Sequence, residues 1–187
     1  MTTKAAADDE DMAWPDHAYT PGQTPRHPAG RFADITRTAG PGSGPEALMR
    51  CRAWRLGLRW AEAGYFWEAH ELFEAVWVAL PQGTPEKRLV QALIQIANAG
   101  LKLRMERPRA VARLAAMARG LLDACAFEPE GTIMGLGRAG PEAWLAGIES
   151  GRLVGADLTG AGGKAIRADA DAATGDHDAD EIRPARP

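Results

Sequence analysis

Apolar and polar positions recur with helical spacing along most of residues 43–150. The pattern predicts four main helices, at about residues 45–63, 65–80, 85–106 and 108–125, and a short fifth one at 141–149. Proline or glycine stands at most of the predicted boundaries, as is typical of helix starts and stops. Neither a strand nor an internal repeat is expected. The sequence therefore predicts an all-α fold, a compact bundle of four main helices plus a short C-terminal helix.

The second predicted helix contains the stretch YFWEAHELFEAVW, residues 65–77. At about 100° per residue, its apolar side chains form one arc: Phe66, Ala69, Leu72, Phe73, Val76, Trp77 and Leu80. His70 falls at the edge of this arc, and Glu74 lies one turn further along the same face, where the two can share a hydrogen bond or a ligand. Glu68 and Glu71 are expected to point away from the arc, towards solvent.

The third predicted helix is apolar on nearly all sides, which is typical of a central helix in a bundle. Its polar residues are spaced 4, 3 and 4 apart and fall in one line: Gln91, Gln95, Asn98 and Lys102. Since three of the four are neutral, we expect this line to face inward. We predict a polar pocket between the second and third helices, lined by His70, Glu74, Trp77, Gln91, Gln95 and Asn98. Lys102, Arg55 and Arg59 are further pocket candidates that could provide charge for an anion, although for the arginines a solvated position, or pairing with Glu74 or Glu106, is favoured over an anion site.

The segments outside the predicted bundle have a different composition. Residues 1–13 are small and acidic, and residues 151–187 are rich in Gly, Ala and Asp, so both are expected to be disordered. Residues 14–42 form a Pro-rich stretch that should be an extended arm. We expect this arm to pack on the helical domain, because Trp14, Tyr19 and Phe32 are costly to leave in water. Whether it covers its own domain or a second subunit of a homodimer stays open.

Composition and charge exclude several classes of protein. The chain has 22 Lys and Arg against 25 Asp and Glu, a net charge of −3, which does not fit a nucleic-acid-binding surface. No stretch has the roughly 18 apolar residues of a membrane span, and the first residues lack the apolar run of a secretory signal. Cys51 and Cys125 lie far apart among apolar neighbours, which favours reduced thiols. A cytoplasmic protein that contacts neither membrane nor nucleic acid is expected.

Several motifs of the predicted helices resemble the domain of unknown function 309 family. The resemblance covers roughly residues 47–125 and depends on HExxExxW, at His70, Glu71, Glu74 and Trp77, and on the run RLVQALIQ at residues 88–95. It continues to Lys102, Arg104 and Arg107-Pro108. The resemblance implies a compact all-helical domain and no established activity. Some members have a His near Leu101, where this chain has none, so a site with two histidines is not implied here.

Three chemical roles for His70 and Glu74 follow from the residues. They can act as metal ligands, although HExxE lacks the second His of a zinc-binding HExxH helix, and His17 or His27 would have to fold back to add a ligand. They can act in general acid–base catalysis, although no nucleophile is evident. They can also form a buried polar network, in which Glu74 and an amide of the third helix provide the hydrogen bonds that a buried imidazole needs.

The leading prediction is a binding or interaction module without a metal or other cofactor. Its partner would be an unknown small molecule or protein at the pocket around His70 and Glu74. The alternative is a metal-assisted or His-based hydrolase, with His70 and Glu74 as the candidate catalytic or metal-binding residues.

Overall fold

The computed structural model describes residues 14–153, which form seven helices and no strand. The helices are α2 (Ala33–Thr36), α3 (Pro45–Arg50), α4 (Arg52–Glu62), α5 (Phe66–Ala79), α6 (Pro85–Arg104), α7 (Pro108–Asp123) and α8 (Ala139–Glu149). The all-α prediction is therefore confirmed. The predicted disordered segments, residues 1–13 and most of 151–187, lie outside this range. None of these helices is both long enough and apolar enough to cross a membrane.

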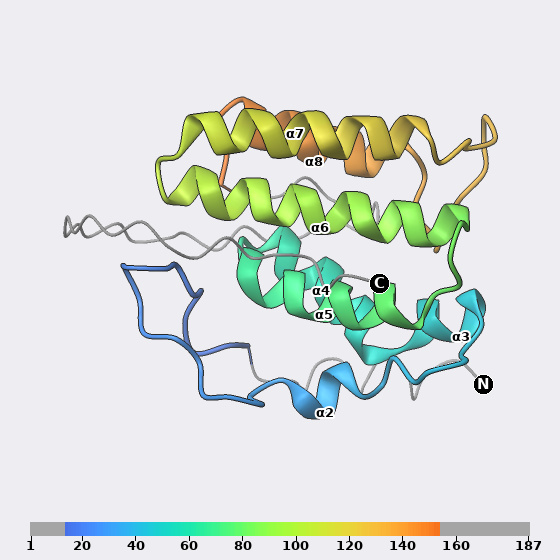
Figure 1. Cartoon of the computed structure of the whole chain (residues 1–187), viewed down its shortest axis with the longest axis horizontal. Helices are drawn as coiled ribbons and strands as arrows, with labels where there is room; N and C mark the ends of the chain where they lie inside the picture. Colours follow the sequence, from blue (N-terminus) through green and yellow to red (C-terminus); the bar gives the residue numbers. More distant parts are fainter. Residues whose placement is uncertain (1–13, 154–187) are drawn as a thin grey trace.

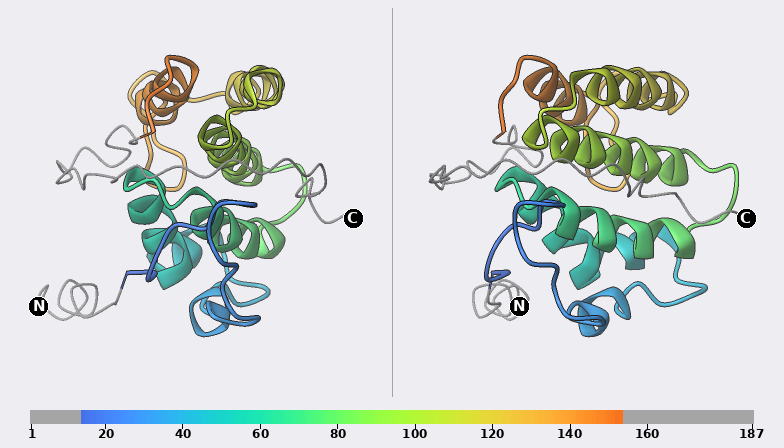
Figure 2. Two further views of the ribbon diagram at one scale, coloured as in Figure 1. Left: turned by 90° about the vertical axis from the view of Figure 1, so that its left-hand side faces the viewer. Right: turned by 60° about the vertical axis from the view of Figure 1, so that its left-hand side comes forward.

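The helices form two packed layers (Figures 1 and 2). One layer holds α6, α7 and α8, and the other holds α4 and α5, with α2 and the N-terminal arm on its outer side. Short loops join α5, α6 and α7 at alternate ends, so that successive helices run in opposite directions (Figure 1). Helix α6 packs against α5, α7 and α8 and is buried on nearly all sides. Its predicted central position is confirmed.

The first predicted helix differs from the structure, because it is divided in two at Cys51. Cys51 has an extended backbone, with ψ of 155°, and ends α3 while it caps α4. Its sulfur accepts a hydrogen bond from the Trp54 amide at 3.4 Å, and the Thr38 hydroxyl accepts one from the Ala53 amide at 3.0 Å. These side chains satisfy amide groups that a continuous helix would bond to backbone carbonyls. The break therefore involves Thr38, which lies outside residues 45–63. The periodicity of residues 45–63 alone does not predict it.

Two glycines allow α5 to pack closely on its neighbours. A Cβ atom on Gly57 of α4 would lie 2.7 Å from the Phe73 ring, and one on Gly100 of α6 would lie 2.7 Å from the Phe66 ring. Both rings are almost fully buried. Aromatic side chains of α5 therefore rest directly on the backbones of α4 and α6.

Charged side chains satisfy the carbonyl groups at both ends of α5. Near its C-terminal end, the buried Lys87 ammonium donates to the carbonyl oxygens of Trp77 and Leu80, at 2.7 and 2.9 Å. Before its first residue, Arg104 donates to the Gly64 carbonyl at 2.8 Å and lies over the Phe66 ring. Both cations come from α6, so these bonds set the position of α5 along α6.

The arm, residues 14–42, lies against α4 and α5 and contains the short helix α2 (Figure 1). Its aromatic side chains contact aromatic residues of the bundle: Trp14 contacts Tyr65, Tyr19 contacts Trp67, and Phe32 contacts Trp60 and Trp67. Phe32 is 7% exposed. Apolar burial therefore positions this Pro-rich segment in the same chain, although the extended-arm prediction did not include α2.

Candidate functional site

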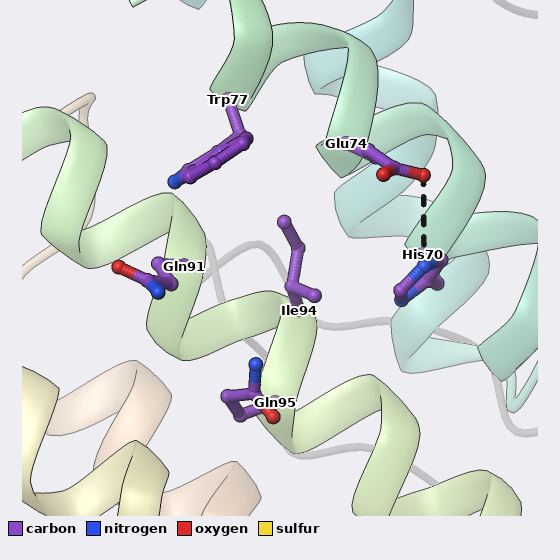
Figure 3. Close-up of a pocket in the computed structure, with 6 residues that line it drawn as sticks. All are labelled: His70, Glu74, Trp77, Gln91, Ile94 and Gln95. Carbon is purple, nitrogen blue, oxygen red and sulfur yellow. Dashed lines mark ion pairs between the residues drawn. The ribbon is translucent and has the colours of Figure 1, made fainter. Parts of the chain in front are cut away.

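A small cavity lies between α5 and α6 at the predicted position. His70, Glu74 and Trp77 line it from α5, and Gln91, Ile94 and Gln95 line it from α6 (Figure 3). Its volume is about 10 Å³, close to the minimum for one water molecule and far below that of an organic ligand. By itself the cavity can therefore hold one atom-sized group.

His70 is the most unusual side chain at this cavity. It is 1% exposed, and neither ring nitrogen has a hydrogen-bond partner among the residues that the structure describes. Its Nε2 lies 3.8 Å from a Glu74 carboxylate oxygen, too far for a hydrogen bond (Figure 3). The predicted hydrogen bonds from Glu74 and a helix α6 amide are therefore absent. Burial lowers the pKa of His70 to about 4, so the imidazole is neutral at physiological pH.

Four other predicted pocket residues do not line this cavity. Asn98 and Lys102 lie further along α6, where Asn98 is buried and Lys102 is half-buried. Arg55 and Arg59 lie on α4, and the Arg59 guanidinium packs over the Trp14 ring at 4.8 Å from its centroid. The spacing on α6 correctly indicates that the amides of Gln95 and Asn98 face inward. It does not indicate that, of the four residues in this line, only Gln91 and Gln95 line the cavity beside His70.

A larger open groove adjoins the cavity and shares Glu74 with it. The groove lies between α5 and residues 36–41, and its volume is about 460 Å³. Its lining surface is mainly apolar and comes from Ala39, Pro41, Ala75 and Val78, together with Thr36, Arg37, Glu71 and Glu74. Glu71 was expected in solvent but is half-buried. Burial raises its carboxyl pKa, and the nearby Glu74 adds to the effect by repulsion.

The structure also reveals a buried contact between Glu68 and His27 that sequence reasoning missed. Glu68 is fully buried, so the prediction that it faces solvent is wrong. One of its oxygens lies 2.8 Å from Nε2 of His27 and accepts a hydrogen bond from the Tyr19 amide at 2.6 Å. Burial raises the pKa of Glu68, and these hydrogen bonds oppose the rise. One signal was present in the sequence, because Glu68 lies one turn before Leu72 of the apolar arc.

His27 does fold back over α5, but it does so at Glu68. Its ring stacks on His17 at 4.4 Å and on Trp67 at 5.8 Å. Glu68 and Trp67 lie before the cavity residues on α5. The arm histidines therefore attach the arm to α5 and do not line the His70 cavity. The structure thus separates the contact that anchors the arm from the cavity that His70 lines.

Three side chains with metal-binding atoms converge where the cavity meets the groove. His70, Glu71 and Glu74 each offer one donor atom, and these atoms lie within 4.8 Å of one another. A neutral imidazole and two carboxylates can bind a cation or a hydrogen-bond donor. Ser and Cys are absent from the lining of the cavity and of the groove, so neither offers such a nucleophile.

Comparison with known proteins finds a family model that matches part of the chain. Neither the curated proteins nor the solved structures include a significant match to it. Residues 54–114 match a family model, described as Domain of unknown function (DUF309), which spans most of α4, all of α5 and α6, and the start of α7. The predicted resemblance to this family is therefore confirmed over residues 54–114.

Proposed function

We propose that the protein is a binding module whose ligand site combines the His70 cavity with the adjoining groove. The observation that carries this proposal is His70 itself. An imidazole buried without a hydrogen bond costs about 1–3 kcal/mol, and His70 has no partner among residues 14–153. A bound group that pairs with His70 would recover that cost, so the folded protein favours a ligand at this position.

The shape of the site supports a ligand with one small polar group and a larger body. The cavity of about 10 Å³ accepts a single atom-sized group, whereas the groove is a wide surface depression of about 460 Å³ that is open to solvent and has room for a larger body. Glu74 lines both. A small molecule or a short peptide segment would therefore lie in the groove and direct its polar group past Glu74 towards His70.

The charges and apolar groups of the groove narrow the class of ligand. Glu71 and Glu74 line the groove, while its one basic residue, Arg37, is paired with Asp34 at 2.7 Å. The Val78 side chain is 62% exposed and provides apolar contact area. These features favour a partly apolar ligand whose polar group donates hydrogen bonds or carries positive charge, or whose binding is bridged by a cation.

A hydrolase that uses His70 as a general base has less support. With a pKa of about 4, the His70 imidazole accepts protons poorly near neutral pH. A covalent mechanism is also unsupported, because neither Ser nor Cys is among the lining residues. Binding without catalysis is therefore the better-supported function.

A thermal-shift screen of metabolites and short peptides tests the proposal. Ligands that stabilise the wild-type protein should stabilise Glu74→Gln and Val78→Lys much less, because one change alters the polar junction and the other blocks the groove. Glu86→Gln is the matched control, since Glu86 is also half-buried but lines neither space. A ligand at about 100 times its Kd adds roughly 2.7 kcal/mol to the free energy of unfolding. Equal stabilisation of all four proteins would place binding elsewhere and refute the proposal.

A further inference from the structure

Helix α5 brings three potential metal ligands together. His70, Glu71 and Glu74 occupy positions i, i+1 and i+4, and one donor atom from each lies within 4.8 Å of the others. His70 Nε2 and Glu74 Oε2 are 3.8 Å apart. Two donors at about 2.1 Å from one ion can be at most about 4.2 Å apart. The His70–Glu74 separation is already within this limit. A small rotation of the half-buried Glu71 side chain would bring its carboxylate within the same distance.

The state of His70 is the second and independent indication of a ligand. The side chain is 2% exposed, its ring nitrogens lack hydrogen-bond partners within the described part of the chain, and Nε2 faces the Glu74 carboxylate. A buried histidine in a purely structural role would normally be hydrogen-bonded.

The carboxylates show why a cation, in particular, fits this position. Glu71 is half-buried beside Glu74, and Glu68 adds further repulsion at Glu71. Arg26 opposes these effects at Glu71. A divalent ion between the imidazole and the carboxylates would offset this repulsion directly and pair with His70 at the same time. A neutral hydrogen-bond donor would pair with His70 but would not offset the repulsion between the carboxylates.

We propose that His70, Glu71 and Glu74 bind one divalent transition-metal ion, with its open coordination positions facing the groove. This inference rests on the proposed function, because it names the group that occupies the same site. One nitrogen and two carboxylate donors suit zinc, manganese or iron better than calcium or magnesium. Three protein ligands leave at least one position for a ligand donor such as a carboxylate or phosphate. The sequence predicted no metal because HExxE lacks a second His; here Glu71 supplies the third donor.

Titration calorimetry with zinc and manganese chlorides tests the site on the full chain, without an affinity tag and after removal of metals by a chelator. We expect one ion per chain for the wild type. Glu71→Gln and Glu74→Gln should each weaken ion binding by at least about tenfold. The loss of a direct ligand should reduce the affinity more than the loss of an outer-shell contact does. Both side chains are half-buried, so these variants should fold even if His70→Ala does not. Glu86→Gln should bind as the wild type does.

Cobalt substitution provides a spectroscopic readout of the same site. Co²⁺ bound through His70 should give a visible absorption band that is lost in Glu74→Gln and retained in Glu86→Gln. A folded wild-type protein that binds no ion at millimolar concentration would overturn the inference. Binding that neither carboxylate substitution weakens would overturn it too, because the ion would then be held elsewhere.

The metal test and the ligand screen can fail separately. If calorimetry detects no bound ion while screened ligands still stabilise the protein in the presence of chelator, the binding module stands and the metal site is refuted. If the ion binds as expected but no screened compound or peptide depends on Glu74 and Val78, the metal site stands and the proposed groove ligand fails.

Discussion

Replacing Gly100 with Ala tests how closely α5 and α6 must approach to form the site. The new Cβ would lie 2.7–2.8 Å from three atoms of the Phe66 ring, which is 1% exposed. Since contacts below 3.0 Å essentially never occur at real Cβ atoms, the ring or the helix must shift. Overpacking of this kind typically costs about 1–3 kcal/mol. Against this, Ala is intrinsically more favourable than Gly within a helix by about 0.8–1.0 kcal/mol.

Gly120→Ala isolates the cost of the close contact. Gly120 also lies within a helix, but a Cβ there would meet no atom within 4 Å. This variant should gain the intrinsic preference of about 1 kcal/mol and pay no packing cost. The difference between the two variants, about 1–3 kcal/mol, is therefore the cost at the α5–α6 contact. Urea unfolding followed by tryptophan fluorescence measures the free energy of unfolding of both variants. In thermal unfolding, each kcal/mol would correspond to a shift of roughly 4 °C in Tm.

A double-mutant cycle assigns that cost to Phe66. Combining Gly100→Ala with Phe66→Leu should recover part of the penalty, with a coupling of about 0.5–3 kcal/mol, because the smaller side chain leaves room for the methyl group. Gly57→Ala against Phe73 repeats the experiment at the α4–α5 contact. If Gly100→Ala stabilises the protein as much as Gly120→Ala does, the close packing described here is incorrect.

Three further predictions concern the cavity histidine and the helix ends. The pKa of His70 is about 4 in the folded protein against 6.5 ordinarily, so the unfolded chain binds protons more readily between these values. The free energy of unfolding should therefore fall as pH drops from about 6.5 to 4, by about 3 kcal/mol from this group. Urea unfolding at pH 7 and about pH 4.5 should show a smaller fall for His70→Gln, and an equal fall would contradict the assignment. Lys87→Met should cost about 2 kcal/mol in thermal unfolding, because the carbonyls of Trp77 and Leu80 lose their buried donor; an unchanged Tm would show that the bonds contribute nothing. Cys51→Ser should raise the free energy of unfolding by up to about 1 kcal/mol, because a hydroxyl caps α4 better than a thiol, whereas Cys51→Ala should not raise it.

Local pattern was sufficient to predict most of the helices. Pro85 and Pro108 begin α6 and α7 as expected, and α5 ends before Pro81. These boundaries follow from proline, whose ring fixes φ and whose nitrogen has no hydrogen to donate. The division at Cys51 could not be read from residues 45–63, because it depends on the Thr38 hydroxyl reaching the Ala53 amide. A side chain from another segment decided where that helix begins.

The candidate site, like the helices, was predicted only in part. His70, Glu74, Trp77, Gln91 and Gln95 do meet at one cavity, as the helical spacing indicated. The hydrogen bonds expected at His70 did not form, and Glu68, assigned to solvent, is buried beneath His27. Periodicity identifies which residues share a face of one helix. It does not give the distance between two faces or which distant segment covers them.

The amino-acid sequence by itself determined the all-α class, the central position of residues 85–104 and the face on which His70 and Glu74 lie. These properties depend on the angle between successive residues and on the location of prolines and apolar groups, which are local. Only the tertiary structure decided that Glu68 is paired with the arm, that Glu71 joins His70 and Glu74, and that the cavity is small and opens beside a groove. Those outcomes depend on which polar groups lose water when segments far apart in sequence pack together, since burial sets both the cost of an unpaired group and its pKa.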